Sequence, residues 1–357
     1  MCAAPISEVV KTLFAKACWE VYSRPLDWFV DQAATNGWSA TEIYLKDRPE
    51  PMAEIRRLHR EANLSLIAQI ITAGDTPEQH LTSLHERYHH ALVSEPLFIN
   101  CHTGRDLFSF DDNRRLFEAA VELSLRAGVP LLHETHRGRA LFTAPLCLAY
   151  LRAVPGLRLT ADFSHLFCVH ESNLADQTEA VDAIIAAADH IHGRVGFSEG
   201  PQLANPRNPA YREWVDLSIG LWTRIRQRMA AEGRAFMTLT PEFGSPLYAP
   251  LRGLSDQPES DPWQSNHWMR DVILRCPMIP GINDQEEHLA AIAQFETRYP
   301  SIQAIEILPW HTMGNSKYAK LGRPAAPQLP AEYVPEFTKD SYRDFFAQKG
   351  CRKVSIC

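Results

Sequence analysis

Short apolar runs alternate with longer amphipathic segments along most of the chain. Short apolar runs are typical of buried strands, and apolar residues with a period near 3.6 are typical of helices. This alternation predicts an α/β protein whose parallel strands are joined by right-handed helical crossovers. The expected strands are a run near 16–23, followed by 40–45, 64–71, 96–103, 129–136, 157–165, 189–196 and 234–243.

Two of the intervening segments indicate where helices begin and end. Residues 111–128 have helical periodicity, with Asp111 or Asp112 as the candidate N-cap and Gly128 as the stop. Residues 171–189 form a second predicted helix. These segments supply the crossovers that a parallel sheet requires.

Polar side chains gather where the later strands end. The fifth expected strand ends in 133–136, the sixth in 162–165, the seventh in 190–192 and the eighth in 241–243. In a closed barrel the C-terminal ends of all strands open onto one face, and that face carries the chemistry. An open doubly wound sheet would string the same residues along an edge. We therefore expect a (β/α)₈ TIM barrel.

The strand ends offer a set of metal ligands: Glu134, Asp162, His192 and Glu242. Carboxylates and imidazole suit Mn²⁺ best, with Mg²⁺, Co²⁺ or Zn²⁺ as alternatives. Two carboxylates about 5 Å apart repel by about 3 kcal/mol at an effective dielectric of about 20, so grouped acids need a cation.

This arrangement favours the isomerisation or epimerisation of a small sugar. A divalent ion stabilises negative charge on a substrate oxygen, while one carboxylate removes a carbon-bound proton and a second returns it. Glu134 and Glu242 are the candidate catalytic pair, acting through an enediolate. A hydride shift could use the same ion.

Each proposed ligand also has an ordinary structural interpretation. Glu134 could form a surface ion pair with Arg137 or Arg139, and Asp162 could cap the following helix. His190 competes with His192, because strand alternation directs both to the same side. Its place nearer the rim favours His192.

The motifs that end these strands carry a resemblance to a known family. Glu134, DFSH (162–165), HIHGR (190–194) and TPEFG (240–244) resemble the xylose isomerase-like TIM barrels, the sugar phosphate isomerase/epimerase superfamily. The resemblance covers about residues 15–275. It implies that Glu134, Asp162, His192 and Glu242 hold one ion and that the two glutamates form the acid–base pair.

The resemblance also implies substrate-binding positions, His165 and Arg194. His102, His136 and Arg139 lie at the expected rim and either contact substrate or make ordinary loop hydrogen bonds. The segments that contain them, 100–106 and 133–139, are similar to a subgroup of uncharacterised isomerases, so no particular substrate is implied.

A second segment follows the barrel, which we expect to span 1–275. Residues 276–357 contain about two further βα units. Within them, 275–289 and 305–323 resemble the last part of pyruvate formate-lyase-activating enzymes, which are radical S-adenosylmethionine proteins. The cysteines lack the C-x₃-C-x₂-C spacing that holds the cluster of those enzymes, so no iron–sulfur cluster is expected.

The composition limits the partners and the cellular compartment that we expect. The 357 residues carry 36 Lys and Arg against 43 Asp and Glu, a net charge of −7, so we expect neither nucleic acid nor membrane as a partner. The 8 scattered cysteines and an N-terminus without a signal pattern predict a soluble cytoplasmic enzyme. The expected partner is a small-molecule carbohydrate, and a homo-oligomer remains open.

Other functions fit part of the pattern. An endonuclease IV-like DNA-repair enzyme would share the barrel but needs several more histidines, for which His133, His136, His165 and His190 are available. A non-catalytic partner module of a glycyl-radical system would use the C-terminal segment instead. Lyase or dehydratase chemistry could use the same ligands.

Overall fold

The computed structural model describes residues 10–46, 48–245, 248–272, 276–278, 284–298, 305–309, 334–352 and 354–356. The chain divides into two compact units, 1–269 and 270–357. Each is described here by itself. Among the described residues, no helix combines the length and apolar character needed to cross a bilayer.

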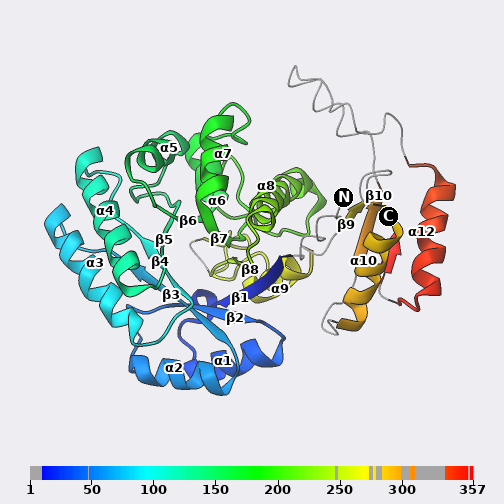
Figure 1. Cartoon of the computed structure of the whole chain (residues 1–357), viewed down its shortest axis with the longest axis horizontal. Coiled ribbons are helices and arrows are strands. Elements are labelled where there is room, and N and C mark those ends of the chain that lie inside the picture. The colour runs from blue at the N-terminus through cyan, green and yellow to red at the C-terminus, as the bar shows by residue number, and fades with distance from the viewer. Residues whose placement is uncertain are drawn as a thin grey trace, which may run out of the picture. The chain divides into compact units, whose positions relative to one another are not determined.

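The first unit is a closed barrel of eight parallel strands, in which each strand pairs with the next along the chain and β8 pairs with β1 (Figure 1). This confirms the predicted TIM barrel. The strands are β1 Lys11–Ala17, β2 Ala40–Tyr44, β3 Ser65–Ile71, β4 Phe98–His102, β5 Leu131–Glu134, β6 Leu159–Ala161, β7 Ala188–His192 and β8 Phe236–Thr240.

Helices connect the strands and cover the outside of the barrel (Figure 1). Leu26 and Phe29 of the first helix, for example, are buried in the same apolar cluster as Ile43 of β2. The helices are α1 Leu26–Thr35, α2 Met52–Glu61, α3 Pro77–Leu92, α4 Phe110–Ala127, α5 Ala144–Ala153, α6 Phe163–His170, α7 Thr178–Ala187, α8 Arg212–Ala231 and α9 Pro262–Val272, with short 3₁₀ turns η1 Trp19–Val21 and η2 Pro209–Tyr211.

Inside the barrel, an apolar layer underlies a polar one. Ala40, Ile67, Phe98 and Leu132 belong to one buried cluster. Because successive side chains in a strand alternate between faces, the residues two positions further along point to the same side. Those positions hold Glu42, Gln69, Asn100 and Glu134. The strands therefore carry their polar residues toward their C-terminal ends, where the candidate site lies.

Several predicted strand boundaries were wrong, and the seventh strand, for example, ends at His192 rather than at 196. The first strand is Lys11–Ala17 rather than 16–23, because Cys18 turns into the αR region and Trp19–Val21 forms a 3₁₀ turn. The sixth strand ends at Ala161 rather than 165. Asp162 is the N-cap of α6, with its side chain accepting from the backbone N–H of Ser164.

Two helix predictions also need correction. The N-cap of α4 is Ser109, not Asp111 or Asp112, since its hydroxyl accepts from a backbone N–H in the first turn. Gly128 ends that helix in the left-handed region, as predicted. The helix expected over 171–189 is Thr178–Ala187, because Glu171 is the left-handed C-cap of α6, which ends at His170.

The second unit contains a parallel three-stranded sheet in the order β11-β10-β9. Ile305 and Ile307 of the central strand pack with Leu289, Tyr342 and Phe346 from two of the helices described in this unit. Parts of the two activating-enzyme-like motifs, 275–289 and 305–323, lie outside the described residues. The elements are β9 Cys276–Met278, α10 Glu286–Arg298, β10 Ile305–Pro309, α12 Glu336–Gln348 and β11 Val354–Ile356.

Candidate metal centre

The structure brings the four predicted ligands together at one end of the barrel. Glu134 ends β5, Asp162 follows β6, His192 ends β7 and Glu242 follows β8. One ligand atom from each lies within 4.8 Å of those from the other three. The Nδ1 atom of His192 lies 3.3 Å from Glu134 Oε1 and 3.0 Å from Glu242 Oε2. Parallel strands that end on one rim thus place four donors around a common point.

Three of the candidate metal-ligating atoms lack a hydrogen-bond partner among the described residues. Glu134 Oε1, Glu242 Oε2 and His192 Nδ1 are all buried and unpaired in this sense. Buried polar atoms in folded proteins are nearly always hydrogen-bonded, so each exception needs an explanation. Here the exceptions face one another and combine carboxylate oxygens with an imidazole nitrogen. This donor set fits a divalent cation.

Charge balance supports the same conclusion. The guanidinium of Arg194 is buried, with Nη2 2.5 Å from Asp162 Oδ2 and Nη1 3.6 Å from Glu242 Oε2. Burial raises the pKa of Asp162 to about 6, against the opposing effect of Arg194. The site holds three carboxylates in a space from which water is largely excluded. A divalent ion would supply the positive charge that such a group needs.

The pKa values of Glu134 and His192 are shifted because neighbouring carboxylates and imidazoles act on each other. Burial alone would raise the pKa of Glu134, but His102 and His192 bring it well below its ordinary value. Burial alone would lower the pKa of His192, but Glu134, Glu242 and Glu42 raise it well above its ordinary value. Carboxylates and imidazole are therefore tightly coupled electrostatically.

The ordinary interpretation of Glu134 as a surface ion pair is wrong. Its side chain is buried, and its Oε2 lies 2.7 Å from His102 Nε2 and 3.1 Å from Asn100 Nδ2. The helix-cap interpretation of Asp162 holds, but it does not exclude ligation. Asp162 Oδ1 accepts from the Ser164 N–H at 2.8 Å, while Oδ2 faces Arg194.

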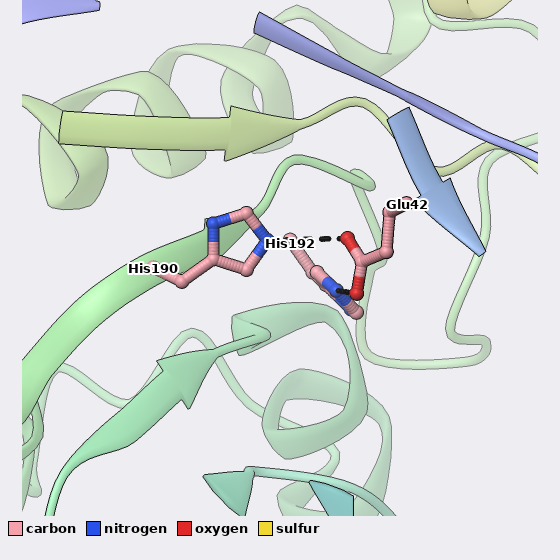
Figure 2. Close-up of side chains that lie close together, drawn as sticks. All are labelled: Glu42, His190 and His192. Carbon is pink, nitrogen blue, oxygen red and sulfur yellow. Dashed lines mark hydrogen bonds and ion pairs between the residues drawn. The ribbon is translucent and has the colours of Figure 1, made fainter. Parts of the chain in front are cut away.

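His190 and His192 have different surroundings in the barrel. His190 Nδ1 lies 2.7 Å from Thr238 Oγ1, and its Nε2 lies 3.2 Å from Glu42 Oε2. Only His192 joins the group of four. Figure 2 shows both histidines directed toward the carboxylate of Glu42. Glu42 was missed, although a single carboxylate within the apolar run of 40–45 was a signal for it.

The predicted substrate-binding histidines form a row beside the ligands. The ring of His136 lies 4.5 Å from that of His102 and 3.9 Å from that of His165, measured between centroids. His165 Nε2 also lies 2.7 Å from Arg194 Nη2. Arg139 is not part of this row, and its Nη1 donates to the Gly104 carbonyl at 3.4 Å.

Two aromatic side chains lie at the mouth of the site, and one of them, Tyr248, was not predicted. The ring of Tyr248 contacts two guanidinium groups. Those of Arg137 and Arg194 each lie 4.9 Å from its centroid. Trp19 meets Tyr248 edge-on at 5.0 Å. Tyr248 comes from a segment outside regular strands and helices, where sequence periodicity carries no signal. The two aromatic side chains add apolar surface and stacked cations to the mouth of the site.

Gly244 leaves space for the ring of Trp19, because glycine has no side chain at this point of close contact. A Cβ atom at residue 244 would lie 1.6 Å from Trp19 Cζ2. We expect Gly244→Ala to lower the free energy of unfolding by about 1–3 kcal/mol, the usual cost of overpacking, in a denaturant titration.

Gly220→Ala is the matched control, because no atom outside its own helix lies within 4 Å of the added Cβ. Alanine is the better helix former, so this variant should gain up to about 1 kcal/mol. A Gly244→Ala protein as stable as wild type would show that Trp19 does not pack against this glycine.

Comparison with solved structures supports the fold. L-ribulose 3-epimerase superposes with a TM-score of 0.52 at 15% identity, covering 73% of this chain and 92% of that one. A xylose isomerase-like TIM barrel protein from Mycobacterium smegmatis, in complex with magnesium, gives 0.47 at 12% identity, covering 73% and 96%. The family-2 AP endonuclease of Brucella melitensis gives 0.49 at 14% identity, covering 72% and 97%. At these identities the likeness concerns the fold.

Comparison with curated proteins finds the other resemblance. The isethionate sulfite-lyase activating enzyme of Desulfovibrio desulfuricans is 48% identical over 52 residues, 15% of this chain and 16% of that protein. The pyruvate formate-lyase-activating enzyme of Streptococcus mutans is 35% identical over 75 residues, 21% and 27%. The chain thus spans about a quarter or less of these relatives. No protein-family model matches the chain. The barrel thus shares the fold of L-ribulose 3-epimerase, and a short segment is similar to activating enzymes.

Proposed function

We propose that this protein is a divalent-metal-dependent isomerase or epimerase that acts on a small sugar or sugar derivative. The observation that carries the proposal is the set of buried, unpaired donor atoms on Glu134, His192 and Glu242 that face one another. Asp162 completes the group. Carboxylate oxygens with one imidazole favour Mn²⁺, with Mg²⁺, Co²⁺ or Zn²⁺ as alternatives.

The bound ion would act as a Lewis acid toward the oxygens of the substrate. Glu134 and Glu242 come from strands on different sides of the site, since β6 and β7 lie between β5 and β8. One glutamate removes the proton from the carbon beside the carbonyl. The other returns a proton at the neighbouring carbon or on the opposite face, which gives isomerisation or epimerisation respectively.

Neighbouring side chains hold the two glutamates in place. Asn100 and His102 contact only Oε2 of Glu134, so Oε1 stays directed toward the other ligands. Arg194 lies near Glu242 and also contacts His165. In this proposal, His165, His136 and His102 orient the hydroxyl groups of the substrate, and Arg194 holds Asp162 and Glu242 in place through its ion pairs. Arg139 would act at the outer edge of the site.

A panel of ketoses, aldoses and their phosphates, incubated with Mn²⁺ in D₂O, tests the reaction. Proton transfer through glutamates that exchange their protons with solvent between turnovers should introduce deuterium at the carbon beside the carbonyl of a converted sugar. The position and extent of labelling are read by NMR and mass spectrometry. Conversion without deuterium uptake would contradict proton transfer and indicate a hydride shift. Denatured protein with Mn²⁺ is the control for uncatalysed exchange.

One observation favours nuclease chemistry as a second candidate. His102, Glu134 and His136 form another group with metal-ligand spacing, and it shares Glu134 with the group of four. A second ion there would give the multinuclear site that hydrolysis of a phosphodiester uses. Cleavage of an abasic oligonucleotide by metal-loaded protein, with more than one ion bound per chain, would favour this candidate over the isomerase.

A further inference from the structure

Glu42 lies inside the barrel with a fully hydrogen-bonded carboxylate. Its Oε1 lies 3.0 Å from His192 Nε2 and 3.0 Å from Asn100 Nδ2. Its Oε2 lies 2.6 Å from Thr240 Oγ1 and 3.2 Å from His190 Nε2. These partners come from β4, β7 and β8, across the barrel interior from β2. Such a network holds the carboxylate in one orientation.

We propose that Glu42 is a positioning residue that makes Nδ1 of His192 the metal-binding atom. An ionised carboxylate only accepts hydrogen bonds, so the hydrogen of His192 in this contact must sit on Nε2. In the neutral imidazole the lone pair is then on Nδ1. That atom faces Glu134 Oε1 and Glu242 Oε2. The proposal rests on the function proposed above and adds a residue outside the group of four.

The remaining partners of Glu42 fix the plane of its carboxylate. Thr240 and His190 both contact Oε2, and His190 is itself held by Thr238. Oε1 is therefore turned toward His192. Carboxylates that accept from a metal-ligating histidine raise its basicity and fix its ring, and their loss typically costs 10–100-fold in metal affinity.

Glu42, His190 and His192 could also be viewed as a cation site of their own, because their donor atoms lie close together (Figure 2). The hydrogen bonds argue against this view. Neither carboxylate oxygen of Glu42 and neither ring nitrogen of His190 is among the buried atoms without a partner. The unpaired nitrogen of His192 is Nδ1, on the other side of the ring. Among these three residues, the atom without a partner thus belongs to the group of four.

Titration calorimetry with Mn²⁺ on the full chain tests the proposal. We expect wild type to bind one ion per chain and Glu42→Gln to bind it about 10–100-fold more weakly. His59→Gln is the matched control. His59 is equally buried and contacts Thr41 beside Glu42 in β2, at 2.7 Å. Because that contact lies on the other face of the strand, the control should lose stability without losing metal affinity.

A spectroscopic measurement separates positioning from general loosening of the core. Co²⁺-loaded wild type should show a paramagnetically shifted imidazole N–H resonance that exchanges slowly with solvent, because Nε2–H of His192 is buried and bonded to Glu42. In Glu42→Gln this resonance should shift or exchange faster. In His59→Gln it should remain as in wild type.

The outcomes distinguish this inference from the proposed function. If wild type binds no ion, the proposed function fails. If wild type binds one ion and folded Glu42→Gln binds it equally well with the same N–H resonance, the positioning role is wrong while the proposed function stands. Two ions in wild type and one in Glu42→Gln would make Glu42 a ligand and also overturn the proposal. Should Glu42→Gln not fold, Glu42→Asp replaces it, and wild-type affinity in that variant would overturn the proposal.

Discussion

Glu242→Gln is expected to lower kcat by about 10²–10⁴-fold on the converted sugar, because the amide cannot carry the proton that a general acid–base residue transfers. Glutamine has nearly the same shape and keeps an oxygen that can ligate a cation. The fold should therefore persist, and metal binding should weaken rather than disappear. Steady-state kinetics and solvent-deuterium exchange on the same substrate measure the loss, since both need the proton carrier.

The control for this variant is Glu232→Gln, which removes an exposed carboxylate that pairs with Arg228 at the end of α8. Its kcat should equal that of wild type. Full activity in Glu242→Gln would show that Glu242 is not one of the two proton carriers. An equal loss of kcat in both variants would show that the effect is not specific to the site.

Asp162→Asn is expected to abolish the stabilisation that Mn²⁺ gives the wild-type protein. An ion that binds only the folded state stabilises it by about 4 kcal/mol when present at 1,000 times its Kd. Wild type should therefore unfold at a clearly higher temperature with Mn²⁺ than with a chelator. The asparagine oxygen can still accept from the Ser164 N–H, so the cap of α6 is retained. The substitution removes the negative charge that would pair with the ion and that pairs with Arg194.

Asp162→Asn should also be less stable than wild type in the chelator, because the buried guanidinium of Arg194 loses its nearest carboxylate. Removing one partner of a buried pair typically costs about 3–5 kcal/mol. Asp182→Asn is the control, since it breaks an exposed ion pair with Arg224. It should cost under about 1 kcal/mol and keep the Mn²⁺ effect. A normal Mn²⁺ shift in Asp162→Asn would exclude Asp162 as a ligand.

The sequence could predict the four candidate ligands because a general rule governs their positions. Side chains at the ends of successive parallel strands must share one rim of a closed barrel. His192 could be preferred to His190 for a related reason, since the residue nearer the strand end lies nearer the rim. Neither inference needs knowledge of loop conformation. The set of ligands depends on strand order, and the preference for His192 depends on its place nearer the rim and on the family resemblance.

The features that escaped prediction depend on contacts between distant segments. Glu42 acquires its role from partners on three other strands, and a single carboxylate in an apolar run does not reveal them. Tyr248 lies in an irregular segment and contacts Trp19, which is far away in the sequence. The end of the sixth strand was misplaced because Asp162 caps a helix at the point where the apolar run continues. Local pattern fixes the type of an element better than its boundary.

Anomalous diffraction from Mn²⁺-loaded crystals, measured at the manganese absorption edge, tests the metal centre most directly. We expect one strong peak about 2.0–2.4 Å from oxygens of Glu134, Asp162 and Glu242 and from Nδ1 of His192. A peak bounded by Glu42 and His190 instead, or no peak among these side chains in protein that is fully folded, would contradict the proposed site and the chemistry built on it.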